Sequence, residues 1–160
     1  MAEVNMARAK QTYDILCKMF DNRNLHYDKM EEDLIIKSSI KGDDFPVDFI
    51  MRVNPRNEIV SFFSMLPFKI DESKRIDMAL AVCAANFGLA DGSFDYDLSD
   101  GTIIFRLTSS YRECVLSEEL LEYMFLVAAS TVDDYNDKFF MISKGMLPVQ
   151  QFIETENNSN

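Results

Sequence analysis

The feature that most constrains the fold is the stretch GSFDYDLSDGTIIFRL at residues 92–107. Its apolar residues alternate with Asp95 and Asp97, which predicts a strand with one apolar and one acidic face. Asp100-Gly101 then favours a tight hairpin turn, and the alternation resumes on the return strand. A two-stranded ribbon is marginal alone, so this hairpin must join a larger sheet and bury its apolar face against helices.

Apolar periodicity and turn residues predict the remaining elements. Helices are expected at residues 2–22, 72–87 and 117–143, and further strands at 33–40, 46–53 and 58–66. The predicted order is α-β-β-β-α-β-β-α, an α+β fold with a five-stranded, antiparallel-rich sheet and three helices. We expect a single domain over residues 1–153 and a disordered tail over 154–160, because those last residues are polar.

The second predicted helix has an apolar stripe of four residues. Ile76, Leu80, Cys83 and Phe87 recur at spacings of three and four, so we expect this face to be buried in the core. Gly88 follows directly and is suited to the left-handed conformation that ends many helices.

Composition excludes some classes of function. The 160 residues include 27 acidic and 16 basic side chains, giving a formal net charge of −11. Such a surface repels phosphate backbones and anionic membranes, so nucleic-acid and membrane binding are disfavoured. No apolar run is long enough to span a bilayer. The three cysteines are widely spaced and form no metal-binding motif, and we expect a reducing, cytoplasmic location.

Two stretches resemble the YbjN family, whose fold is that of the type III secretion chaperones. The first comprises Asn86-Phe87-Gly88-Leu89, Gly92, Phe94, Asp97, Asp100-Gly101, Ile103 and Phe105-Arg106, and the second Thr131-Val132-Asp133-Asp134-Tyr135 with Gly145. We assign fold-defining roles, in turns and helix caps, to Gly88, Gly92, Asp100 and Gly101. The resemblance implies a small, acidic, dimeric protein that holds extended segments of another polypeptide, and it implies no catalytic residues.

The titratable residues predict no active site. His26, the only histidine, belongs to no nucleophile or metal motif, and we interpret it as a surface or packing residue. Asp91, Asp95, Asp97 and Asp100 form a loose calcium-loop pattern, but Thr102 stands where the closing glutamate would be. The acidic groups 118–122 and 133–137 are interpreted as exposed helix faces. We therefore expect no cofactor and no metal. The alternative is a metal- or small-ligand-binding protein or enzyme that uses the acidic hairpin face.

A candidate interface is expected on the sheet face away from the helices. Isoleucines at 35, 50 and 104 alternate with residues assigned to the core, and the adjacent Phe62 and Phe63 must face opposite sides. The candidate residues are Ile35, Ile50, Arg52, Phe62, Phe63, Ile104 and Arg106. A second copy or a partner's extended segment could cover this face; the alternative is the chain's own tail, through Phe152 and Ile153. The sequence predicts a non-enzymatic, chaperone-like or regulatory protein-binding module that forms a homodimer.

Overall fold

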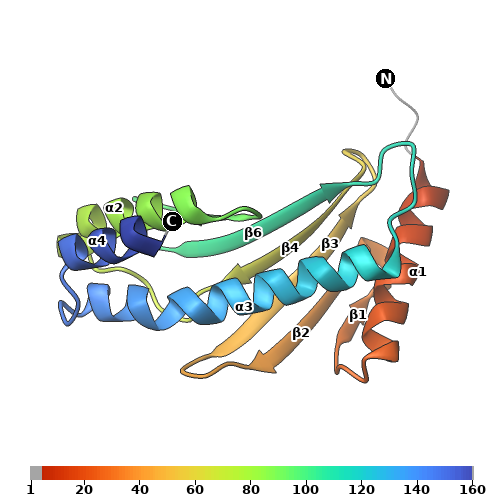
Figure 1. Cartoon of the computed structure of the whole chain (residues 1–160). Coiled ribbons are helices and arrows are strands. Elements are labelled where there is room, and N and C mark those ends of the chain that lie inside the picture. The colour runs from red at the N-terminus through yellow and green to blue at the C-terminus, as the bar shows by residue number, and fades with distance from the viewer. Residues whose placement is uncertain (1–4, 160) are drawn as a thin grey trace.

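The computed structural model describes residues 5–159, which form six strands and four α-helices (Figure 1). The elements are α1 (Met6–Asn22), β1 (Asp28–Met30), β2 (Ile35–Lys41), β3 (Pro46–Asn54), β4 (Ile59–Met65), α2 (Arg75–Gly88), β5 (Ser93–Tyr96), β6 (Ile103–Ser110), α3 (Glu118–Ser143) and α4 (Val149–Ser159). The α+β class and the predicted strands and long helices are confirmed. The counts of five strands and three helices are wrong, because β1 and α4 are additional. Residues 2–4 of the predicted first helix lie outside the described residues.

The strands form one antiparallel sheet in the order β1-β2-β3-β4-β6-β5. Figure 1 shows α3 lying along the sheet, α1 at the β1 end, and α2 and α4 together at the other end. Burial alternates strictly along β3, where Val47, Phe49 and Met51 are buried and Asp48 and Ile50 are exposed. The helices therefore cover one face of the sheet, and the opposite face is open.

α4 replaces the predicted disordered tail up to residue 159. Phe152 is 2% exposed and packs its ring against Tyr135 and Phe139 of α3. The Tyr135 hydroxyl also donates a hydrogen bond of 2.6 Å to Glu156. Phe152 thus anchors a mostly polar helix, which also packs along α2. The tail consequently packs on the helix layer, which contradicts the alternative that it covers the open sheet face.

α2 is rotated relative to the prediction. Its buried residues are Met78, Ala81, Val82 and Ala85, whereas the predicted core stripe of Ile76, Leu80, Cys83 and Phe87 is exposed. The buried residues are mostly smaller, which lets α2 pack closely against α4 and β5. The left-handed cap at Gly88 is also wrong: Gly88 is the last residue of α2, and Leu89 caps it in an extended conformation.

The hairpin of β5 and β6 is confirmed, but its turn is longer than predicted. The Asp97 N–H donates to the Thr102 carbonyl at 2.9 Å, so residues 98–101 form the loop. Gly101 has the positive φ of +78° that the sequence predicts, and Gly92 enters β5 with a φ of +75°. β1 has only three residues, which are all exposed and show no alternation. The sequence pattern therefore does not predict it.

Candidate functional site

The open face of the sheet carries a row of apolar side chains at its centre. Ile50 of β3 lies opposite Phe63 of β4, and Met65 of β4 lies opposite Ile104 of β6. Ile50 is 45% exposed and Met65 is 57% exposed. Large apolar side chains at this exposure on neighbouring strands form a contiguous patch, which is typical of an interaction surface.

Most of the residues predicted for the interface lie on this face. Ile35, Arg52 and Arg106 alternate with the buried positions of their strands, in register with the apolar row. Phe63 is half-buried on the open side, whereas Phe62 is completely buried in the core. Phe62 is therefore excluded from the interface, as strand alternation requires of one of these two adjacent residues.

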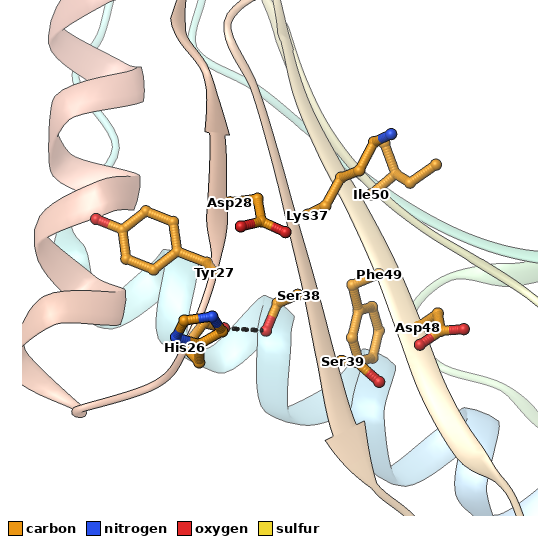
Figure 2. Close-up of a pocket in the computed structure, with 9 residues that line it drawn as sticks. All are labelled: His26, Tyr27, Asp28, Lys37, Ser38, Ser39, Asp48, Phe49 and Ile50. Carbon is orange, nitrogen blue, oxygen red and sulfur yellow. Dashed lines mark hydrogen bonds between the residues drawn. The ribbon is translucent and has the colours of Figure 1, made fainter.

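Three hollows follow one another across the open face. The first, of about 420 Å³, is lined by His26, Asp28, Lys37, Asp48 and Ile50 among others, and Figure 2 shows these side chains around it. The second, of about 460 Å³, is lined by Asp48, Ile50, Phe63, Met65, Leu66, Pro67 and Ile104. The third, of about 590 Å³, is lined by Met65, Lys69, Asp95, Tyr96, Asp97, Leu98, Asp100, Thr102 and Ile104. Neighbouring hollows share two residues each, so we call the continuous depression the open-face trough.

Ion pairs hold two of the acidic side chains at the β5 end of the trough. Arg106 of β6 forms a bidentate pair with Asp95 of β5, with nitrogen–oxygen distances of 2.7 and 3.0 Å. This contact raises the pKa of Arg106. Hydrogen bonds from Lys69 and Thr102 lower the pKa of Asp100 to about 2. Asp100 is therefore ionised at neutral pH.

The predicted calcium-loop pattern is divided among separate partners. Asp95 pairs with Arg106 and Asp100 with Lys69, while Asp97 accepts hydrogen bonds from Ser99. Asp91 accepts a hydrogen bond from Tyr123 of α3. Among the described residues, no group of three His, Cys, Asp or Glu side chains is placed to hold a metal ion. Carboxylates that point to different partners cannot converge on one cation.

His26 lies exposed at the β1 end of the trough. Its backbone carbonyl accepts a hydrogen bond of 2.8 Å from the Ser38 hydroxyl, as Figure 2 shows. This hydrogen bond ties the chain to β2 just before β1 begins. The interpretation of His26 as a surface residue agrees with this position.

Asn86 closes one edge of the sheet, a role that the sequence pattern does not reveal. Its side-chain amide donates to the Phe94 carbonyl at 3.0 Å and accepts from the Phe94 N–H at 2.8 Å. The amide thus makes the two hydrogen bonds that a further strand would make with β5. An asparagine next to a helix end and five to ten residues before a strand is the only signal that could have suggested it.

A second apolar surface lies on α2. Ile76, Leu80, Cys83 and Phe87 occupy the face opposite the buried one, with Ile76 70% and Phe87 84% exposed. We call these four residues the α2 seam. A helix that is apolar on both faces is normally packed on both faces.

Comparisons with known proteins identify the fold. No family model and no curated protein matches the chain. Among solved structures, YbjN from E. coli, proposed to be a transcription regulator, matches with a TM-score of 0.55 and 10% identity over 91% of this chain and 92% of that one. This is the YbjN-like fold of the type III secretion chaperones.

Two further structures with this YbjN-like fold contain complexes. The HopA1–SchA chaperone–effector complex matches with a TM-score of 0.55 and 12% identity over 84% of this chain and 99% of that one. The ExsC–ExsE complex matches with a TM-score of 0.56 and 14% identity over 78% of this chain and 90% of that one. At these identities the likeness is one of fold. Within the described part of the chain, no helix is long and apolar enough to cross a membrane.

Proposed function

We propose that this chain is a non-catalytic, chaperone-like protein-binding module that holds an extended segment of a partner in the open-face trough. The observation that carries this proposal is an uncovered sheet face with Ile50 and Met65 exposed at its centre. Covering that patch would remove apolar surface from water at about 25 cal/mol per Å². The partner-bound structures of the same fold support a protein ligand, and YbjN supports a regulatory variant of the same role.

The sheet edges offer less room for a partner than the face does. Asn86 already satisfies the outer N–H and carbonyl of Phe94 at the β5 edge. At the other edge, β1 provides only three residues, Asp28–Met30. Pairing with an edge strand depends on a row of free backbone groups. Side-chain contacts on the open face are therefore the main source of affinity that we propose.

The experiment is a selection of phage-displayed random peptides on immobilised protein. We expect peptides to enrich on the wild-type chain and not on Ile50→Glu, because the substitution places an unpaired charge in the apolar centre. Met146→Glu is the matched control, since Met146 is 62% exposed and lies outside the trough. Peptides that enrich equally on Ile50→Glu, with unchanged circular dichroism, would refute the proposed site.

We further propose that the module is a homodimer joined through the α2 seam rather than through the sheet face. The seam residues are spaced four, three and four apart, which is the repeat of a two-stranded coiled coil. In an antiparallel pair, Ile76 would lie against Phe87 and Leu80 against Cys83 of the second copy. This arrangement leaves the open-face trough of each copy free for its partner.

Sedimentation and cross-linking test the homodimer. We expect a dimer at micromolar concentration that Leu80→Glu converts to monomer, because Leu80 is half exposed in the free chain and its replacement leaves the fold intact. A short bis-maleimide should join two chains through Cys83, and Cys83→Ser should abolish the product while Cys114→Ser does not. A dimer that Ile50→Glu dissociates and Leu80→Glu leaves intact would instead place the interface on the sheet face.

The alternative function is that of a metal- or small-ligand-binding protein, for which the acidic end of the trough offers a hollow but, among the described residues, no carboxylates grouped around one cation. The third hollow has a volume of about 590 Å³ and is lined by Asp95, Asp97 and Asp100. Calorimetry with calcium, magnesium and manganese separates the two functions: tight, stoichiometric binding that Asp97→Asn removes would favour the alternative. We propose a cytoplasmic location, which the free thiols of Cys17, Cys83 and Cys114 support.

A further inference from the structure

We infer that the open-face trough selects an extended segment of about seven residues that crosses the strands, is apolar in its middle and carries a basic side chain at each end. This inference rests on the proposed function and adds the length and chemistry of the segment. It depends on three properties of the trough: its span, its apolar centre and its two acidic ends.

The span follows from the strand order. The trough begins beside Asp28 of β1 and ends beside Asp97, which follows β5. These two strands are the outermost of the six, so the trough crosses five strand intervals. At about 4.8 Å per interval the path is about 24 Å long, and an extended chain at about 3.3 Å per residue covers it with about seven residues.

The centre of the trough requires apolar side chains. Ile50, Phe63, Met65 and Ile104 line its middle hollow of about 460 Å³ together with Leu66, Pro67 and Asp48. Alternate side chains of an extended segment point to the same side. Two apolar side chains separated by one residue would therefore both contact the residues that line this hollow.

Among the residues that line its two end hollows and their ion-pair partners, each end of the trough has one carboxylate more than it has cations. At the β1 end, Asp28 and Asp48 accompany Lys37, and none of the three forms an ion pair within residues 5–159. Such unpaired carboxylates attract a cationic side chain, as does the chain's net charge of −11.

At the β5 end, the ion pairs Asp95–Arg106 and Asp100–Lys69 each have no net charge. Asp97 adds a third carboxylate, and its hydrogen-bond donors come from the neutral Ser99. A Lys or Arg at each end of the bound segment would complete both sites, whereas an acidic residue would be repelled.

Three synthetic peptides, labelled for fluorescence anisotropy, test this inference. KTLTLTK matches the trough, ETLTLTE reverses the end charges, and KTSTSTK removes the apolar centre. We expect KTLTLTK to bind at least about tenfold more tightly than either control. Asp97→Asn should weaken KTLTLTK severalfold and reduce its salt dependence, since asparagine keeps the oxygen that accepts from Ser99 and loses only the charge.

Protein variants locate the binding. Ile50→Glu and, separately, Ile104→Ser should abolish or strongly weaken KTLTLTK binding, while Leu80→Glu on the α2 seam should leave it unchanged. Equal affinities for the three peptides, no detectable binding of KTLTLTK, or binding that survives both trough substitutions would overturn the inference. The peptide selection separates this failure from that of the proposed function: peptides of a different pattern that still need Ile50 would leave the function intact and refute the segment chemistry.

Discussion

Replacement of Gly101 by alanine tests the packing of the β5–β6 loop. Gly101 has a φ of +78°, where a side chain costs about 1–2 kcal/mol. An added Cβ would also lie 2.2 Å from the Ile70 carbonyl oxygen and 2.8 Å from the Ile70 nitrogen, so the two segments must separate. That movement breaks the 2.9 Å hydrogen bond from Ile70 N–H to the Gly101 carbonyl, and unpaired buried groups cost about 1–3 kcal/mol.

Gly101→Ala should therefore lower the free energy of unfolding by about 2–5 kcal/mol. In a chain of this size the melting temperature should fall by about 5–15 °C. Gly145→Ala is the matched control, because Gly145 has a φ of +71° but an added Cβ would meet only Lys74 side-chain atoms at 3.9 Å. Gly145→Ala should lower the free energy of unfolding only by the cost of placing a side chain at positive φ, about 1–2 kcal/mol.

Calorimetry and urea unfolding of both variants measure the two contributions separately. If Gly101→Ala and Gly145→Ala lose the same stability, the contact with Ile70 adds nothing and the steric argument is wrong. If Gly101→Ala has the same melting temperature as the wild type, the loop is placed incorrectly.

Three further substitutions test single contacts. Asn86→Ala leaves the N–H and carbonyl of Phe94 unpaired and should lower the free energy of unfolding in urea by about 2–4 kcal/mol. Asn86→Asp should have an intermediate effect, because it keeps the acceptor. An Asn86→Ala variant as stable as the wild type would mean that water replaces the amide. Lys69 and Thr102 hold the pKa of Asp100 at about 2, below its ordinary 3.8, so its stabilisation is present above about pH 4 and is lost as the pH falls toward 2. Asp100→Asn should flatten the fall in melting temperature across that range, and an unchanged pH profile would contradict the contact. Cys17→Ser buries a hydroxyl at a position where burial raises the pKa of the thiol, and it should cost about 1–2 kcal/mol without affecting peptide binding.

Local chemistry accounts for the elements that the sequence predicts. Ser117 caps α3 by accepting a hydrogen bond from the Leu120 N–H at 3.2 Å, and two glutamates follow it in the first turn. The alternation along β3 identifies Ile50 as exposed and Phe49 as buried. These features depend on residues close together in the chain, and part of the candidate site follows from them.

The tertiary structure alone decided the orientation of α2 and the docking of α4. Periodicity identifies the buried face of a helix only when the other face is polar, and α2 is apolar on both. Close packing then selected Met78, Ala81, Val82 and Ala85 for the interior and left the larger Ile76 and Phe87 outside. Likewise, Phe152 is one aromatic in a polar helix, and only the surface formed by Tyr135 and Phe139 gives it a place to be buried. The sequence by itself determined five of the six strands, the hairpin and the two faces of the sheet, because strand alternation and turn residues act locally. The choice of which helix face is buried depended on contacts between segments far apart in the chain.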